Sequence, residues 1–392
     1  MADNKHRAKT ARKSLGYHII RAKQPDNEQL GPVGVIVFDM KKTAVFMGAG
    51  ASKPFGFPLT CELLPLMQEK LNSGELFRRS QSAREELSRY ITRLLPGFNS
   101  VAPENLPLIT DVLSLVDHSL FSSNSLTPLM AKRDLARLRI LLEWAILEVL
   151  DLELLPLPHI VPTSLARLTD WLFAQTRMDG HSVGVISTNY DIALETQLFR
   201  RYSDHLIRTE FDFGFSWRDT STGTVYERPA NPSFRLYKLH GSLNWLRCDL
   251  CDHVYINIYG SIADLSFTEG VHSNNTCHCN YAPLRSVIIA PSLVRDIRDV
   301  NLLECWKNAI EFLRTASEWI IIGYSFPPED IAIRSLFLRA YNGRESPPEI
   351  RIVQKGESRD VISRYKLFFP NCIYDTDGLE GFLAREYTPT GT

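Results

Sequence analysis

The chain of 392 residues lacks the features that mark several large classes of protein. No apolar run is long enough to cross a bilayer, so we expect no membrane-spanning helix and no membrane partner. The formal net charge of −1 provides no overall field that would attract nucleic acid or a membrane surface. There is also no internal repeat and no low-complexity segment. What is present, 44% hydrophobic and 23% charged residues, is typical of a globular protein with a large core.

The one local charge bias lies at the N-terminus. Within residues 1–23, seven Lys and Arg side chains face a single acid, Asp3. We interpret residues 1–30 as a solvated basic arm, and the alternative is a contact arm for a partner subunit or nucleic acid. Elsewhere we expect no direct nucleic-acid binding. No apolar stretch with a small-residue cleavage site follows the arm, so we expect no secretory signal and a cytoplasmic location.

The rest of the chain, residues 31–392, alternates between strand-like and helical patterns. Short apolar runs rich in β-branched residues indicate strands, and several are apolar on both faces, as buried parallel strands are. They lie at 33–38, 43–47, 182–187, 285–290, 319–323 and 349–354. Helical spacing occupies 301–316 and 328–341. This alternation predicts an α/β fold with a Rossmann-like parallel sheet and helices on both faces.

Two segments depart from the alternation. Residues 62–179 carry leucines at helical spacing, which predicts a helical insertion. Residues 248–284 have weak periodicity and many Asn, Ser, Cys and His residues, which indicates a small insertion outside the main sheet. The helical region has more large apolar side chains than one sheet face needs, which favours a homo-oligomer, unless these side chains face the chain's own core. They include Leu63, Leu64, Leu66, Leu94, Leu95, Leu113, Leu115, Leu120 and Phe121.

A glycine-rich loop follows the strand predicted at 43–47. It reads Gly48-Ala49-Gly50-Ala51-Ser52. Glycines let a backbone approach a pyrophosphate closely, and a following helix N-terminus supplies amide donors. The third glycine of the full dinucleotide fingerprint is not at its expected spacing, so a tight turn without a ligand is the alternative.

Three more polar segments follow apolar stretches. Ser187-Thr188-Asn189-Tyr190-Asp191 ends one predicted strand, residues 238–245 contain His240 and Gly241, and Gly323-Tyr324-Ser325 ends another strand. Polar groups at the carboxyl ends of parallel strands lie where open α/β sheets bind ligands. The alternatives are a helix cap for Asp191 and a structural role for His240.

The order of these four segments resembles the motif order of the sirtuin family: a Gly-Ala-Gly-x-Ser loop, an Asn-x-Asp element, a His-Gly element and a Gly-x-Ser turn. The resemblance covers about 43–61, 182–247 and 285–380. It implies NAD as the bound nucleotide and Asn189, His240 and Asp191 as catalytic residues. The residues that it places at NAD are Gly48, Ala49, Gly50, Ala51, Ser52, Pro58, Thr188, Gly323 and Ser325.

The first loop departs from that of the deacylating sirtuins. Where they read Gly-Ile-Pro-Asp-Phe-Arg, this chain has Gly56-Phe57-Pro58-Leu59-Thr60-Cys61. This change and the long helical insertion are similar to bacterial sirtuin-like proteins of antiphage defence, which cleave NAD to nicotinamide and ADP-ribose. We therefore expect an NAD hydrolase, with a protein deacylase or an NAD or ADP-ribose sensor as alternatives. The resemblance also implies an activating partner, for which a hexameric HerA-type ATPase is a candidate.

Seven cysteines need an account in a cytoplasmic chain, where stable disulfides are rare. Cys61, Cys305 and Cys372 lie in apolar or mixed surroundings, so we expect core residues. The other four form two thiolate pairs that suit a tetrahedral structural zinc site, and sirtuins carry a zinc module at this point. They are Cys248, Cys251, Cys277 and Cys279. The alternatives are four free thiols, or a ligand set that includes His253, His272 or His278.

Overall fold

The computed structural model describes residues 41–122, 125–154, 160–178, 180–201, 204–262, 267–268, 271–293 and 299–387. The predicted basic arm and the strand expected at 33–38 lie outside the described residues. Over the ranges just given, no helix combines the length and the apolar character that crossing a membrane requires.

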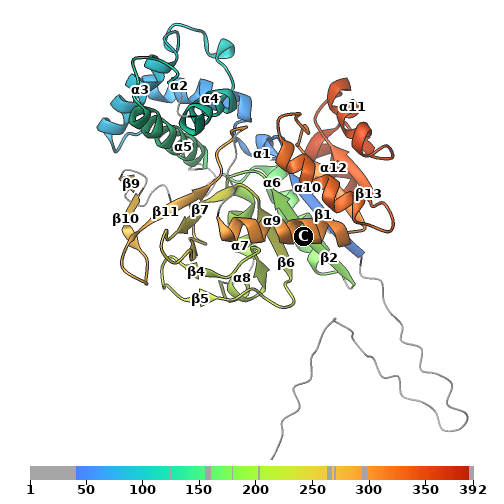
Figure 1. Cartoon of the computed structure of the whole chain (residues 1–392). Helices are drawn as coiled ribbons and strands as arrows, with labels where there is room; N and C mark the ends of the chain where they lie inside the picture. The colour runs from blue at the N-terminus through green and yellow to red at the C-terminus, as the bar shows by residue number, and fades with distance from the viewer. Residues whose placement is uncertain are drawn as a thin grey trace, which may run out of the picture. The chain divides into compact units, whose positions relative to one another are not determined.

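A seven-stranded parallel sheet carries the fold (Figure 1). In spatial order its strands are β14 (Ile373–Asp375), β13 (Glu349–Val353), β12 (Glu318–Ile322), β1 (Lys41–Met47), β2 (His181–Ser187), β6 (Phe234–Lys238) and β3 (Phe211–Asp212). Val45 of β1 pairs with Ile320 on one side and Val185 on the other, and all three are buried. Such two-sided burial is typical of a parallel sheet covered on both faces. The predicted Rossmann-like α/β class is confirmed.

Helices cover the two faces of this sheet. They are α6 (Thr163–Thr176), α7 (Ala193–Arg201), α8 (Asp204–Glu210), α9 (Val300–Thr315), α10 (Ile331–Asn342), α11 (Arg359–Phe368) and α12 (Gly378–Glu386). Helix α6 packs against β2, α7 and α12, whereas α9 packs against β1, β6 and α10. The loops after β2, β12 and β13 therefore run from the carboxyl edge of the sheet into the helices of these two layers, whereas β3 and β6 lead directly into strands of a second sheet.

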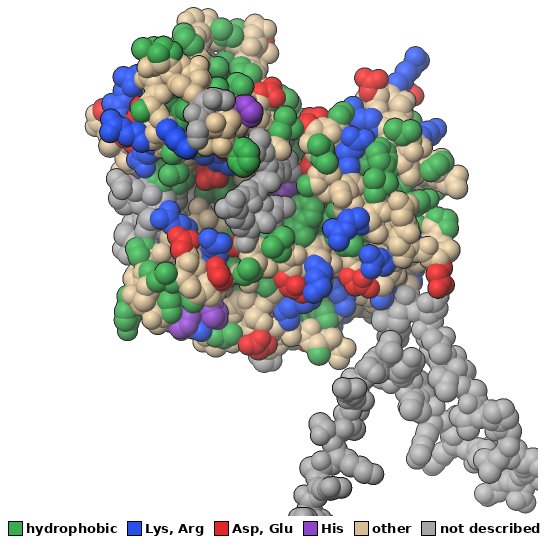
Figure 2. Space-filling model, in the orientation of Figure 1, with side chains coloured by type: hydrophobic (Ala, Val, Ile, Leu, Met, Phe, Trp, Pro, Cys, Tyr) green, Lys and Arg blue, Asp and Glu red, His purple; other side chains and the backbone are tan. Residues whose placement is uncertain are grey.

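Between β1 and α6 the chain forms a group of helices that we call the helical cluster: α2 (Leu63–Ser73), α3 (Gln81–Leu94), α4 (Ile109–Ser122) and α5 (Lys132–Leu154). Helices α2, α3 and α4 each pack against α5. Of the nine apolar side chains expected to favour an oligomer, only Leu115 and Phe121 are exposed, and the others are buried or half-buried in the core. On the face shown in Figure 2, hydrophobic side chains lie among Lys, Arg, Asp and Glu.

A second seven-stranded sheet is formed by chain segments between β3 and β12. In spatial order its strands are β5 (Val225–Tyr226), β4 (Trp217–Asp219), β8 (Val254–Ile256), β7 (Gly241–Arg247), β11 (Pro283–Ile288), β10 (Val271–Thr276) and β9 (Phe267–Thr268). It is mixed, and β4 and β8 are its parallel pair. The run 285–290 was expected as a parallel strand of the main sheet, and this prediction is wrong. Most of it belongs to β11, which pairs antiparallel with β7 and β10.

Candidate active site

The carboxyl ends of β1 and β12 mark a topological switch point of the main sheet. The chain leaves β1 toward β2 and β6, whereas β12, β13 and β14 extend in the opposite direction. Open α/β sheets bind ligands at such a point. The amide of Gly48, just after β1, donates to the Ile322 carbonyl at 3.0 Å, and the Gly50 amide donates to the Gly323 carbonyl at 2.8 Å. The two glycine-containing loops are thus joined directly.

Gly323 is required by this contact. Its φ of +61° is unfavourable for other residues, and a Cβ atom would lie 2.0 Å from the amide nitrogen of Ala51. The helix that follows Gly48, α1 (Ala49–Ser52), has only four residues. Within it, the Ala51 amide donates to the Gly48 carbonyl. Several amides expected to face a phosphate are therefore engaged within the loops, and fewer donors remain for a ligand than the sequence indicated.

Asn189 and Asp191 are tied to the glycine loop through Ser52. The Asn189 side-chain amide donates to the Gly48 carbonyl and to Ser52 Oγ, both at 2.9 Å. Ser52 Oγ donates in turn to Asp191 Oδ2 at 2.8 Å. The other oxygen of Asp191 accepts from the Ala193 amide at 3.2 Å, at the start of α7. Asp191 therefore both contacts the glycine loop through Ser52 and accepts an amide at the start of a helix.

His240 lies between β6 and β7, and its position is fixed by backbone contacts on both sides. Its Nδ1 lies 3.2 Å from the Thr188 carbonyl oxygen, and the side chain is 6% exposed. A carbonyl can only accept, so Nδ1 carries the hydrogen and Nε2 of the neutral ring keeps its lone pair. Gly241 has a φ of +83°, and a Cβ atom there would lie 2.0 Å from the Val287 carbonyl. That close approach fixes the turn after His240.

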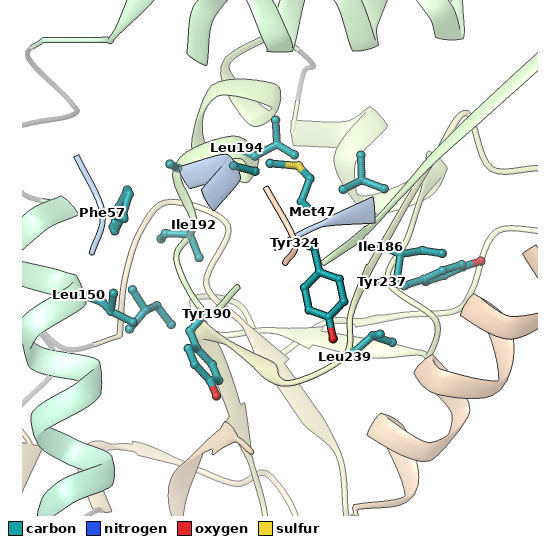
Figure 3. Packing of buried hydrophobic residues seen from close by; sticks show 14 of the residues in the cluster. Met47, Phe57, Leu150, Ile186, Tyr190, Ile192, Leu194, Tyr237, Leu239 and Tyr324 are labelled. Atoms are coloured by element: carbon teal, nitrogen blue, oxygen red, sulfur yellow. The ribbon is translucent and has the colours of Figure 1, made fainter. Parts of the chain in front are cut away.

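Buried apolar side chains surround these segments. Figure 3 shows Met47 at the end of β1, Ile186 near the end of β2 and Leu239 just after β6. Tyr190 and Trp306 lie near the His240 ring, with centroid separations of 6.1 and 6.4 Å. The polar groups of the site are therefore held in a largely apolar environment, which strengthens their electrostatic interactions.

The segment 289–293 connects this site to the helical cluster. The Tyr190 hydroxyl donates to the Ile289 carbonyl at 2.6 Å, and the Ile289 amide donates to the His240 carbonyl at 2.8 Å. Four residues later, the Leu293 amide donates to Ser114 Oγ of α4 at 2.8 Å. A short piece of chain thus spans the distance from α4 to the two site segments.

An ion pair beneath the site was not predicted from the sequence. Lys238 Nζ lies 2.5 Å from Glu195 Oε1, and both side chains are buried. Burial raises the pKa of Glu195, although the nearby Lys238 opposes this shift. The sequence did contain a signal: Lys238 is a charged residue at the end of strand β6, two residues before His240.

The first loop is closed by an exposed ion pair. Lys53 Nζ lies 2.6 Å from Glu62 Oε2, and the same carboxylate accepts from the Leu59 amide at 2.7 Å. Pro58 is buried within this loop. Cys61, expected as a core residue, is exposed, whereas Cys305 is buried and Cys372 is half-buried.

The turn after β12 is braced by its neighbours. The Tyr324 carbonyl accepts from Gln354 Nε2 and from the Tyr365 hydroxyl, each at 2.6 Å. Ser325 is exposed, and its carbonyl accepts from Arg364 at 3.0 Å. These contacts leave the Ser325 side chain at the surface of the carboxyl edge.

The four clustered cysteines lie in the second sheet, and their sulfur atoms are all within 4.8 Å of one another. The Cys248 and Cys279 sulfurs are 3.8 Å apart, and those of Cys251 and Cys277 are 3.4 Å apart. Four thiolates at about 2.3 Å from a central tetrahedral ion would be roughly 3.8 Å from one another, so the geometry fits a metal ion.

The protonation of the cluster also favours a cation. Burial acts to raise the pKa of Cys277, but hydrogen bonds from the Tyr255 hydroxyl and the Cys279 amide outweigh it and lower the pKa to about 6. The neighbouring Cys277 raises the pKa of Cys279 to about 12. One thiolate therefore disfavours ionisation of the next unless a positive ion compensates the charge. The cluster could hold a metal ion.

Comparison with known proteins gives matches among solved structures. No protein-family model and no curated protein matches the chain. Among solved structures, Sir2Tm bound to a propionylated peptide is 14% identical, with 88% of this chain and 90% of that chain covered and a TM-score of 0.37. A Sir2 homologue mutant in complex with ADP-ribose is 13% identical, with 89% and 93% covered and a TM-score of 0.39. A structure from work on sirtuin substrate affinity is 15% identical, with 89% and 94% covered and a TM-score of 0.38.

Proposed function

We propose that this chain is an NAD hydrolase of the sirtuin type, which cleaves the bond between nicotinamide and ribose and releases nicotinamide and ADP-ribose. The observation that carries the proposal is the linkage of three segments at the switch point. Asn189 is hydrogen-bonded to the glycine loop, and His240 is held by Thr188, the residue before Asn189. These contacts at one edge of the sheet support a site in which a potential base lies next to a bound dinucleotide.

In the proposed reaction the nicotinamide–ribose bond breaks and its electron pair leaves with neutral nicotinamide. The ribose carbon becomes electron-poor and bonds to a water oxygen, while the water proton passes to a base. His240 is that base, acting through Nε2 on water or by way of a ribose hydroxyl. Asn189 orients the ribose and the water, and Asp191 orients the Asn189 segment.

The remaining site residues hold the nucleotide. The loop of Gly48, Ala49, Gly50, Ala51 and Ser52 lies against the pyrophosphate, together with Thr188. Pro58 belongs to the nicotinamide side, and Gly323 and Ser325 belong to the adenosine side. We also assign one structural zinc ion to Cys248, Cys251, Cys277 and Cys279, because four thiolates in tetrahedral spacing are a typical ligand set for zinc.

Product analysis with and without an acylated peptide tests the function. Free ADP-ribose formed without peptide identifies a hydrolase, whereas product formed only with peptide identifies a deacylase. Asn189→Ala should abolish the cleavage. The matched control is Asn308→Ala, because Asn308 also bridges carbonyl oxygens with its amide, at 2.7 and 3.0 Å, but lies on α9. Binding of NAD without any product would instead identify a sensor.

We further propose that the activity is gated and serves antiphage defence in the cytoplasm. An unrestrained NAD hydrolase would deplete its own host of NAD, so assembly or a second protein must control it. The resemblance described above gives a hexameric HerA-type ATPase as a candidate activator, and the exposed apolar side chains of the helical cluster favour a homo-oligomer. Measuring NAD cleavage with the ATPase added and omitted, each with and without phage DNA, tests the gate.

A further inference from the structure

We infer that Lys238 is a positioning residue, whose buried ammonium group fixes residues 190 and 191 relative to His240. This role extends the proposed hydrolysis and rests on it. Lys238 does not contact a ligand in this scheme. It acts through the backbone that carries Asn189 and Asp191.

All three donors of the ammonium group have an acceptor. Lys238 Nζ donates to the Asp191 carbonyl at 2.5 Å, to the Tyr190 carbonyl at 3.3 Å and to Glu195 Oε1 at 2.5 Å. The Lys238 side chain is only 2% exposed and that of Glu195 only 5%. The lysine therefore joins the end of β6 to the turn after β2 and to the first turns of α7.

A buried ion pair is a costly way to stabilise a fold, because an apolar pair of similar volume usually does as well. What an apolar pair cannot do is satisfy and direct two buried carbonyl groups. Both carbonyls here belong to the two residues that follow Asn189. A lysine is therefore explained here by the need for donors directed at the carbonyl groups of residues 190 and 191, in the segment that carries Asn189.

Backbone bonds already join the ends of the strands. The Leu239 amide donates to the Ser187 carbonyl at 2.8 Å, and the Leu243 amide donates to the Tyr190 carbonyl at 3.0 Å. Lys238 adds the tie to Asp191, whose carboxylate accepts from Ser52, the residue that also holds Asn189. Loss of this tie should let the Asn189 segment move while the sheet remains intact.

The test uses the double variant Lys238→Met with Glu195→Gln, which removes both charges and leaves no unpaired carboxylate. The control is Arg208→Met with Asp219→Asn, because that pair is also largely buried, with 2.8 Å between its atoms, but joins α8 to β4. Hydrogen exchange of residues 187–193 is measured by mass spectrometry. Turnover of NAD and binding of ADP-ribose are measured on the same proteins.

We expect exchange in 187–193 to rise about tenfold in the double variant and to stay at the wild-type level in the control. The kcat should fall about 100-fold, whereas the Kd for ADP-ribose should change less than about threefold. Unchanged exchange in 187–193 would overturn the inference, whether or not the wild type cleaves NAD. A wild type without turnover, together with raised exchange in the variant, would retain the positioning role and refute only the proposed hydrolysis.

The single variant Glu195→Gln separates the effect of the ion pair from that of the contacts between Lys238 and the two carbonyl groups. It removes the counter-charge but leaves an amine that still has donors for both carbonyls, so kcat should stay within about threefold of wild type. A loss as large as that of the double variant would show that the ion pair, and not the carbonyl tie, is what matters, and would refute the inference as stated.

Discussion

The hydrogen bond at one nitrogen of His240 determines the chemistry available at the other. The Thr188 carbonyl occupies Nδ1, so the second nitrogen is the one that can accept a proton. The same carbonyl belongs to the residue before Asn189, so the orientation of the proposed base and that of the proposed ribose ligand depend on one peptide. A small shift of this segment would therefore affect both residues at once.

We expect His240→Ala to lower kcat for NAD cleavage by about 100-fold or more, because a positioned general base contributes that much to a rate. The matched control is His181→Ala, because His181 lies at the opposite end of β2, near Thr43 and Glu318. Nicotinamide release measured by chromatography should be near normal in the control. Full activity of His240→Ala would remove this residue from the mechanism.

Residues that directly follow apolar strands could be predicted, and residues paired at long range could not. Asn189, Asp191 and His240 were found because parallel strands bring their carboxyl ends to one edge. The partners Lys238 and Glu195 are 43 positions apart, and no local pattern in a single sequence encodes that pairing. Ser52 was expected to face the pyrophosphate. Only the structure shows that its hydroxyl group also bonds to both Asn189 and Asp191.

Among the elements, α5 carries a carboxyl group in an unusual environment. Glu148 accepts from the Phe77 amide at 3.0 Å, and Phe77 has a φ of +53° in the loop between α2 and α3. Burial raises the pKa of Glu148 to about 7, although that hydrogen bond opposes the shift. Because the folded pKa exceeds the ordinary value of 4.5, the folded state keeps a proton that the unfolded chain releases. The stability that protonated Glu148 contributes to the fold is complete below the ordinary pKa of 4.5, and it is lost as the pH rises to about 7.

Glu148→Gln should therefore raise the Tm at pH 8 and leave it nearly unchanged at pH 5. With allowance for the partial exposure of Glu148, the gain is about 1 to 2 kcal/mol, or a few degrees in a chain of this size. Thermal unfolding at both pH values measures it. Glu69→Gln, at an exposed position of α2, should show no such pH-dependent difference. An equal effect of both substitutions would contradict the assignment to Glu148.

The cysteine cluster should bind one zinc ion per chain and hold part of the second sheet in place. Cys248 and Cys277 belong to a small core with Leu246, Tyr255 and Leu284, so loss of the ion would disturb β7, β8 and β11 together. Elemental analysis of protein purified without chelator should show zinc in the wild type, and much less in Cys277→Ser. Cys372→Ser should retain it, because Cys372 packs against the main core. A wild type without metal would end this assignment.

At the scale of the whole molecule, four central strands of the main sheet could be predicted, whereas β3, β6, β14 and the second sheet could not. Short apolar runs, separated by helical patterns, indicated β1, β2, β12 and β13. The second sheet contains strands of two or three residues, such as β4, β5 and β9, which are too short to show a period. The run 285–290 has strand character, but an apolar pattern does not reveal which sheet a strand joins. Only the contacts with β7 and β10 determine that.

The last prediction concerns assembly. Most of the leucines first considered are buried or half-buried in the chain's own core, so they do not form a contact between subunits. Phe121 is 85% exposed, Leu115 48% and Leu129 66%, and all three belong to α4 or to the chain between α4 and α5. In a symmetric dimer each such side chain occurs once in each subunit, so the contact buries two copies of it. Full burial contributes about 1.5–3 kcal/mol per side chain.

Light scattering should therefore show an oligomer at micromolar concentration, and Phe121→Ser with Leu115→Ser should shift it toward the monomer. Leu367→Ser on α11, where the side chain is 77% exposed, is the matched control and should leave the assembly unchanged. A wild type that stays monomeric refutes the assembly. An oligomer that survives the double substitution moves the contact away from α4.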